Sequence, residues 1–111
     1  MPMIAFTLRS LVPAIEAGGL VVLDFWAPWC GPCHRFSPVF ERVAAAHRDD
    51  DDIVFGTVNT DDEQQLAGLF GVQSLPTVVI IRDGTAVFAE PGPFTGRDLE
   101  RILDLHRGAG E

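Results

Sequence analysis

The sequence predicts an α/β protein, a three-layer α/β/α sandwich in which four helices cover a central mixed sheet of five strands. Two observations predict this class. Apolar segments typical of strands alternate with segments whose apolar residues recur at helical spacing. Near the end, Asp83-Gly84 separates two strand-like segments as a two-residue hairpin turn of type I′. The predicted order is β-α-β-α-β-α-β-β-α, in one domain over residues 1–107 with a loose tail at 108–111.

The first elements are a short strand, a helix and a buried strand. Residues 3–7 suit a short edge strand, and Ser10 is a suitable N-cap for a helix that runs to about Ala17 and stops at Gly18-Gly19. Residues 20–27 are apolar at nearly every position, which is typical of a strand buried on both faces. Asp24 is therefore a conspicuous exception inside that strand.

A longer helix is predicted next, because Pro32 can occupy the first helical position, where its missing N–H is not needed. Pro38 lies inside this helix and should kink it. The acidic run 49–52 is expected to be a solvated loop before a strand over residues 53–58. The inward side chains of the helix are predicted to be Phe36, Val39, Phe40 and Val43.

The second half supplies a short helix, a hairpin and a final helix. The short helix is predicted to start at Asp61 or Asp62 and to end near Phe70. The hairpin strands are residues 77–81, rich in β-branched side chains, and residues 85–89, after which Thr95 caps the last helix. The predicted apolar contacts are Leu66, Leu69 and Phe70 in the short helix, and Leu99, Ile102, Leu103 and His106 in the last one.

Charge and length exclude several classes of function. The 111 residues include eight Lys and Arg against sixteen Asp and Glu, and this net charge of -8 argues against binding nucleic acid or an anionic membrane. No apolar run approaches the length of a membrane span, and the N-terminal residues lack the pattern of a secretory signal. We therefore expect a protein of the cytoplasm.

Residues 29–34, Trp-Cys-Gly-Pro-Cys-His, contain both cysteines and fit three chemistries. Cys30 and Cys33 have the spacing of a redox dithiol, with His34 they also match the C-x-x-C-H pattern of haem attachment, and two Cys with a His could form part of a zinc site. Zinc is disfavoured because a closed structural site needs four ligands. Haem fits poorly because the motif follows a buried strand and no export signal is visible.

The predicted strand, loop and helix place Cys30 at a helix N-terminus, where unpaired N–H groups and the helix dipole stabilise a thiolate. Cys33 lies one turn further along and is expected to be more buried. Cys30 is thus the candidate attacking sulfur and Cys33 the candidate resolving sulfur. Asp24, a carboxyl in a buried strand, should have a raised pKa that suits proton exchange; a structural hydrogen bond is the alternative role.

The motif Trp29-Cys30-Gly31-Pro32-Cys33, with Asp24 upstream and Pro76 downstream, resembles the thioredoxin family over nearly the whole chain. The resemblance implies a protein-disulfide reductase in which Cys30 forms a mixed disulfide and Cys33 resolves it. It implies a cis bond before Pro76 and a substrate-docking patch made of Trp29, Gly31, Pro32, Leu75 and Gly92. It further implies protein disulfides as substrates, an NADPH-dependent thioredoxin reductase as electron donor, a monomer, and no cofactor or metal.

The sequence departs from the family pattern at a few positions. Thr57 stands where many thioredoxins have a lysine near the buried aspartate, which should raise the pKa of Asp24 further. Pro91 and Pro93 flank Gly92 and should stiffen the docking loop, and His34, where the family often has lysine, is expected to face solvent. Two other functions remain open at this stage, a non-catalytic binding module of the same fold and a c-type haem protein.

Overall fold

A computed structural model describes residues 3–107, which form five strands and four helices in the predicted order. The prediction of a loose tail at 108–111 lies outside the described residues. The strands are β1 (Ile4–Ala5), β2 (Leu20–Trp26), β3 (Ile53–Asn59), β4 (Thr77–Arg82) and β5 (Thr85–Pro91). The helices are α1 (Leu8–Glu16), α2 (Gly31–Ala46), α3 (Gln64–Leu69) and α4 (Gly96–Arg107).

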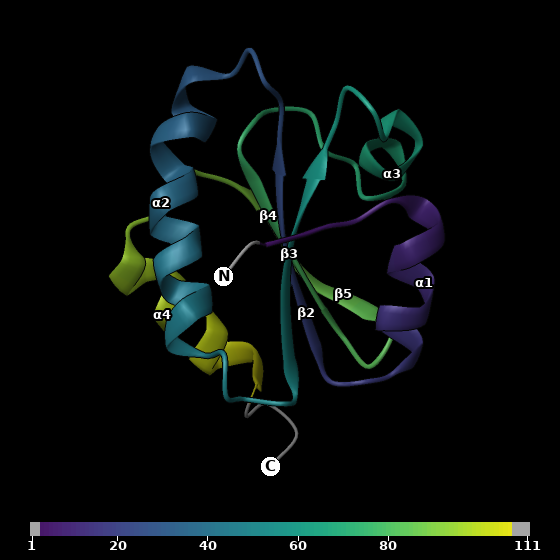
Figure 1. The fold of residues 1–111 in the computed structure, drawn as a ribbon, viewed down its shortest axis with the longest axis vertical. Helices are drawn as coiled ribbons and strands as arrows, with labels where there is room; N and C mark the ends of the chain where they lie inside the picture. Colours follow the sequence, from purple (N-terminus) through teal and green to yellow (C-terminus); the bar gives the residue numbers. More distant parts are fainter. Residues whose placement is uncertain (1–2, 108–111) are drawn as a thin grey trace.

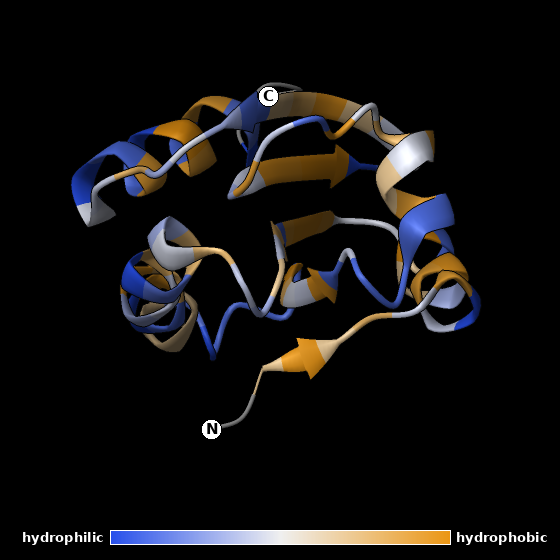
Figure 2. Cartoon of the chain, turned by 90° about the horizontal axis from the view of Figure 1, so that it is seen from above, coloured by the Kyte–Doolittle hydropathy of each residue, from blue (hydrophilic) through white to orange (hydrophobic). Residues whose placement is uncertain are grey.

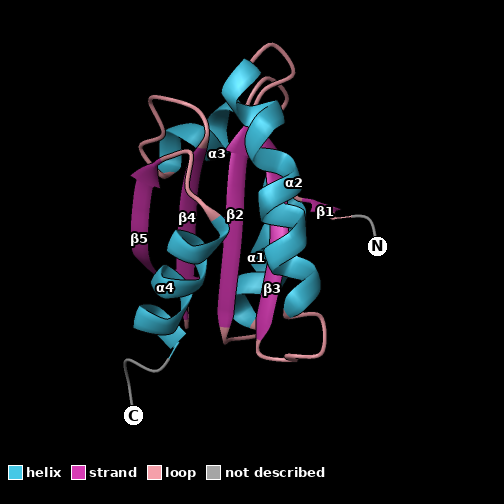
Figure 3. Ribbon diagram, turned by 90° about the vertical axis from the view of Figure 1, so that its left-hand side faces the viewer, coloured by secondary structure: helices cyan, strands magenta, loops and turns pink. Residues whose placement is uncertain are grey.

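The strands form one mixed sheet in the order β1-β3-β2-β4-β5 (Figures 1 and 3). β1 and β2 both pair with β3 in parallel, whereas β4 is antiparallel to β2 and to β5. β2 therefore occupies the centre, and its Asp24 lies in register with Thr57 of β3 and Val78 of β4. This confirms the mixed five-stranded sheet and the short edge strand at the N-terminus.

Each face of the sheet is covered by two helices, so the molecule has three layers. One core contains inward side chains of α2 and α4 against alternate residues of β2, β3 and β4, including Val22 and Ile80. The other contains Leu11 of α1 and Leu66 of α3 against the intervening strand residues. Figure 2 shows strands that are hydrophobic along most of their length between helices of mixed character, as expected for a sheet buried on both faces. Within residues 3–107 no helix is both long and apolar enough to cross a membrane.

The N-cap predicted for the first helix is wrong, because the helix begins earlier, at Leu8. The hydroxyl oxygen of Thr7 accepts a hydrogen bond from the N–H of Ser10 at 3.1 Å, and the Ser10 hydroxyl oxygen accepts one from the N–H of Thr7 at 2.9 Å. This is a capping box in which Ser10 takes the place usually held by Glu or Gln. Ser10 is thus the third helical residue, and Thr7 is the cap.

The short helix α3 also differs from the prediction. It starts at Gln64, rather than at Asp61 or Asp62, and Glu63 occupies the N-cap position without a capping hydrogen bond from its side chain. Leu66 is fully buried as predicted, but Leu69 is 66% exposed, because this short helix turns only one edge toward the sheet. Asp83 and Gly84 both have positive φ values, 50° and 86°, which is the geometry of the predicted type I′ turn.

The end of α2 is joined to α4 through His47, the C-cap residue. Its Nδ1 lies 2.7 Å from a carboxylate oxygen of Asp50 and its Nε2 lies 2.7 Å from one of Glu100. Burial by itself lowers the pKa of His47, but the hydrogen bonds and charges of the two carboxylates outweigh burial and raise it. His47 therefore links the C-terminal end of α2 to the following loop and to α4.

Candidate active site

The cysteine loop lies between the end of β2 and the start of α2. Cys30 is the N-cap of α2, and its Sγ accepts a hydrogen bond from the backbone N–H of Cys33 at 3.2 Å. The N–H of Cys30 in turn donates to the carbonyl oxygen of Ala27 at 3.1 Å, which closes the turn. Pro32 is the second helical residue rather than the first, because the helix already begins at Gly31. Cys30 therefore has the helix-end environment that the sequence predicts.

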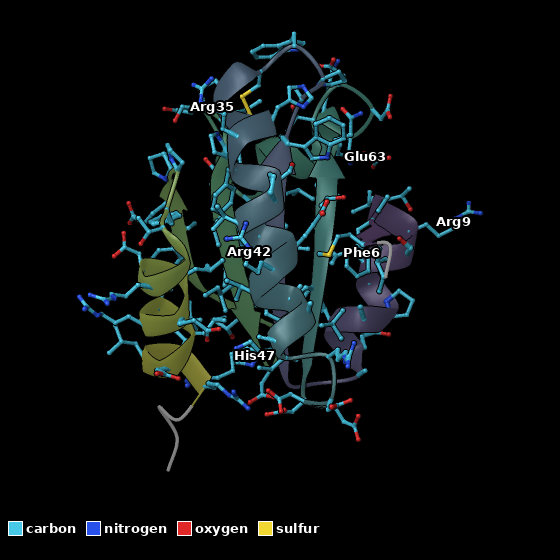
Figure 4. The ribbon with its side chains drawn as sticks, turned by 60° about the vertical axis from the view of Figure 1, so that its left-hand side comes forward. Phe6, Arg9, Arg35, Arg42, His47 and Glu63 are labelled. Atoms are coloured by element: carbon cyan, nitrogen blue, oxygen red, sulfur yellow. A yellow bond between two sulfur atoms is a disulfide. The ribbon has the colours of Figure 1, made fainter. Side chains whose placement is uncertain are left out.

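Cys30 and Cys33 form a disulfide bond with their Cα atoms 5.3 Å apart. Cys30 is 5% exposed and Cys33 has no exposed surface, so both residues are buried and Cys30 is the more accessible of the two. The pair packs against Ala27, Trp26 and Leu75. Figure 4 shows the disulfide at one end of α2, with His47 at the other. The structure thus describes the oxidised state of the dithiol.

Asp24 is buried in the centre of the sheet, where it is 1% exposed. Burial raises its pKa from the ordinary 3.8 to about 7. Every second side chain of a strand points to the same face of the sheet, so Asp24 shares a face with Val22 and Leu20. Those two residues pack against α2, so Asp24 lies on the sheet face that is covered by the helix that carries Cys33. Among residues 3–107, its Oδ1 has no hydrogen-bond partner.

Within residues 3–107 no side chain or backbone group of the protein donates a hydrogen bond to this oxygen of Asp24. Thr57 lies beside it in register on β3, at the position where the family resemblance places a lysine. The pKa of Asp24 is raised by burial alone, with no cation to oppose it. A carboxyl with these properties can take up and release a proton near neutral pH.

An open groove with a volume of about 570 Å³ lies beside the disulfide. It brings together five residues that the sequence predicts for the site, namely Trp29, Cys30, Gly31, Pro32 and Leu75. Its other wall comes from residues that sequence reasoning missed, which are Thr60, Ala67, Val72, Gln73 and Ser74. Residues 72–74 could have been predicted from the sequence, because they directly precede Leu75 and Pro76.

Pro76 and Gly92 do not line this groove, although both lie close to Leu75. The Leu75–Pro76 peptide is cis, as the family resemblance implies, and the Gly92–Pro93 peptide is also cis, which the sequence analysis did not anticipate. The N–H of Gly92 donates to the carbonyl oxygen of Pro76 at 2.8 Å. Gly92 is therefore tied to the segment that carries Leu75.

Two further contacts hold the loop before Cys30, and neither was predicted. The indole Nε1 of Trp29, a side chain that is 71% exposed, donates to Asp61 at 3.1 Å. The ring Nε2 of His34 lies 2.7 Å from the carbonyl oxygen of Pro28. His34 is exposed, as expected. No group of three or more His, Cys, Asp or Glu within residues 3–107 is arranged to hold a metal ion.

Comparisons with known proteins agree with this geometry. The thioredoxin family model matches residues 6–104. A thioredoxin 2 homologue of Streptomyces coelicolor is 51% identical over 104 residues, which is 94% of this chain and 75% of the relative. The thioredoxin of Bacillus subtilis is 38% identical over 88 residues, covering 79% of this chain and 83% of the relative.

Solved structures show the same relationship. A mutant thioredoxin from Halobacterium salinarum superposes with a TM-score of 0.82 at 28% identity, covering 96% of this chain and 90% of that one. Plasmodium falciparum thioredoxin gives the same TM-score at 25% identity, covering 95% of this chain and 99% of that one. With its disulfide at a helix N-terminus, beside an open groove and near a buried carboxyl, this chain belongs to the thioredoxin family of thiol-disulfide oxidoreductases.

Proposed function

We propose that this protein reduces disulfide bonds of other proteins, with Cys30 as the attacking sulfur and Cys33 as the resolving sulfur. The observation that carries the proposal is the asymmetry of the pair. Cys30 is the N-cap of α2 and lines the groove, whereas Cys33 lies in the first turn of the helix, has no exposed surface and is not among the residues that line the groove. A helix N-terminus stabilises a thiolate, so the sulfur that lines the groove is also the more acidic one.

The reaction proceeds by two thiol-disulfide exchanges. The Cys30 thiolate attacks one sulfur of the substrate disulfide; a Cys30–substrate disulfide forms, the substrate bond breaks, and the other substrate sulfur leaves as a thiolate. The Cys33 thiolate then attacks the sulfur of Cys30, which releases the second substrate thiolate. The substrate is reduced by two electrons, and the protein ends in the Cys30–Cys33 disulfide that the structure contains.

We assign Asp24 the role of exchanging the proton of Cys33. The support is its burial on the sheet face under α2, its unpartnered Oδ1 and its pKa of about 7. A group of that pKa can accept the proton from the Cys33 thiol as the mixed disulfide is resolved and return it to solvent or to the leaving thiolate near neutral pH. Asp24 is here a general base rather than a structural residue.

The substrate is proposed to dock as an extended segment along the groove. Trp29, Gly31, Pro32 and Leu75 supply a surface that is mainly apolar. Leu75 packs against the disulfide, and its backbone next to Pro76 would add the substrate as a short strand beside Cys30. Gly92, through its bond to Pro76, would border the same docking surface.

Membership of the thioredoxin family supports three further proposals. We propose an NADPH-dependent thioredoxin reductase as the electron donor, a monomer as the working form, and the cytoplasm as the compartment. Residues 1–107 would act as one catalytic domain, of which the family model covers residues 6–104. The net charge of -8 supports a freely diffusing protein that is kept from self-association.

Reduction of insulin in the presence of dithiothreitol tests the proposal. The wild type is expected to accelerate insulin precipitation, and Cys30→Ser is expected to lose this activity entirely. Cys33→Ser keeps the attacking sulfur but cannot resolve the mixed disulfide, so the reduced variant, once freed of dithiothreitol, should bind insulin covalently without turning over. A wild type no faster than dithiothreitol alone would instead favour a non-catalytic binding module with the same fold.

A further inference from the structure

The ring of His34 links the helix that carries the disulfide to the loop that precedes it. His34 directly follows Cys33, and its Nε2 lies 2.7 Å from the carbonyl oxygen of Pro28. The same ring meets the indole of Trp26 edge-on, with centroids 6.2 Å apart and planes at 69°. One side chain therefore contacts the end of β2 and the loop beyond it.

The contact to Pro28 defines which ring nitrogen carries hydrogen. A carbonyl oxygen only accepts hydrogen bonds, so the Nε2 of His34 must donate. The neutral ring is then the tautomer with hydrogen on Nε2, and the imidazolium ion, which has hydrogen on both nitrogens, satisfies the contact equally. The bond to Pro28 is thus available whether or not the ring is charged.

The carbonyl oxygen of Pro28 belongs to the peptide group that leads into Trp29. Pro28 has no N–H, and among residues 3–107 no backbone N–H donates to this oxygen. His34 therefore holds the backbone that enters Trp29, while Asp61 holds its indole Nε1 at 3.1 Å. The two contacts together fix a side chain that is otherwise 71% exposed.

We propose that His34 is a positioning residue for protein substrates. Its bond to the Pro28 carbonyl holds the Trp29 side of the groove in the shape against which a protein disulfide docks. The inference rests on the proposed docking of substrates in this groove. Because His34 and Pro28 are both exposed, their bond adds little to the stability of the fold, and its effect falls on the groove instead.

This role differs from an electrostatic effect of a charged His34 on the nearby thiolate. An electrostatic effect would change the reactivity of Cys30 toward every disulfide, large or small. A positioning effect changes only substrates that contact Trp29. A small aromatic disulfide such as 5,5′-dithiobis(2-nitrobenzoate) reaches Cys30 without docking along the groove, so it separates the two roles.

The test compares two amides of different reach. The amide nitrogen of Gln lies at about the position of the histidine Nε2, whereas that of Asn lies at the position of Nδ1 and falls short of Pro28. His34→Asn is expected to raise the KM for insulin about 2- to 10-fold with kcat unchanged, the effect of one lost hydrogen bond on docking. His34→Gln should restore the wild-type KM. Reduction of the small disulfide should be unchanged in both variants.

Arg42→Ala is the matched control, since Arg42 is an exposed residue midway along the same helix (Figure 4). It should behave as wild type with both substrates. Long-range ¹⁵N correlation spectra provide a readout that does not depend on activity, and they should show the neutral His34 ring with hydrogen on Nε2. A ring with hydrogen on Nδ1 would overturn the inference.

The kinetic outcomes also separate this inference from the function on which it rests. A wild type that fails to reduce insulin would overturn the proposed function and the role of His34 together. An active wild type with indistinguishable Asn and Gln variants would overturn only the role of His34. An equal loss toward insulin and the small disulfide would assign His34 an electrostatic effect on the thiolate and would likewise refute positioning.

Discussion

Replacing Asp24 by Asn should change how the stability of the oxidised protein depends on pH. In the unfolded chain this carboxyl ionises near 3.8, and in the folded protein near 7. Between those values the folded state holds a proton that the unfolded state has lost, so the free energy of unfolding falls as pH rises. At about 1.4 kcal/mol for each pH unit between the two values, the total loss is about 4 kcal/mol, complete above the folded pKa.

Asp24→Asn removes this titration, because an amide does not ionise in this range. The free energy of unfolding is measured for both proteins by urea denaturation from about pH 4 to about pH 8. The variant's value minus that of the wild type should increase by about 4 kcal/mol from the acidic to the alkaline end. The absolute gain at the alkaline end is smaller, since an unpaired buried amide costs about 1 to 3 kcal/mol at every pH.

Asp104→Asn is the matched control, since it removes the same charge from an exposed position on α4. Its stability curve should run parallel to that of the wild type. If the Asp24→Asn curve is also parallel to the wild type, the carboxyl ionises alike in both states, and the reasoning from burial to a raised pKa is refuted. The same result would remove the support for Asp24 as the base for Cys33.

Three further changes test other parts of the structure. His47→Gln should destabilise the protein more at acidic than at alkaline pH in the same urea experiment. Because the pKa of His47 is raised in the folded protein, its contribution to the free energy of unfolding is complete below pH 6.5 and is lost as pH rises through the folded pKa. A destabilisation that grows with pH would contradict a raised pKa. Gly56→Ala should lower the free energy of unfolding by about 1 to 3 kcal/mol, since a Cβ there would lie 2.9 Å from the Ile4 carbonyl oxygen and against the Phe6 ring. Gly68→Ala, with open space around it, should cost nothing. Equal effects of the two substitutions would count against the packing of β1 on β3. Trp29→Ala should raise the KM for insulin about 5- to 30-fold, whereas Leu105→Ala, which removes another large exposed hydrophobic side chain (65% exposed, on α4), should leave the KM unchanged. A Trp29→Ala variant with wild-type KM would show that the indole is not part of the docking surface.

Much of the fold could be predicted because the spacing of apolar residues in the sequence indicates which side chains are buried. The continuous apolar run of β2 and the helical spacing of Phe36, Phe40 and Val43 in α2 follow from a sheet covered on both faces, and the structure confirms them. The Asp83-Gly84 turn was equally accessible, because both residues tolerate positive φ. These features depend on local chemistry that a sequence states directly.

The errors arise where a local signal has two interpretations. Thr7 and Ser10 are both good cap residues, and only the reciprocal hydrogen bonds between them decide which one caps α1. Leu69 has helical spacing from Leu66, but the burial of one edge of a short helix depends on how α3 sits on the sheet. Neither decision can be made without the tertiary packing.

The site could be predicted at its reactive groups but not in its supporting contacts. Cys30, Cys33 and Asp24 stand out because a dithiol and a buried acid are rare in such positions. The hydrogen bonds from the His34 ring to the Pro28 carbonyl oxygen and from the Trp29 indole to the Asp61 carboxylate involve loop residues, and no periodic sequence pattern predicts them. Such contacts depend on the conformation of the loops, which the spacing of residues in the sequence does not predict.

The most direct test of the account is the capture of a mixed disulfide. Reduced Cys33→Ser protein, mixed with insulin and analysed by mass spectrometry after digestion, should yield a substrate peptide linked to Cys30, because the attack occurs and its resolution is blocked. Cys30→Ser, which leaves only the fully buried Cys33, should yield no adduct at a comparable rate. Capture through Cys33 in preference to Cys30 would contradict the assignment of the attacking sulfur to the N-terminus of α2.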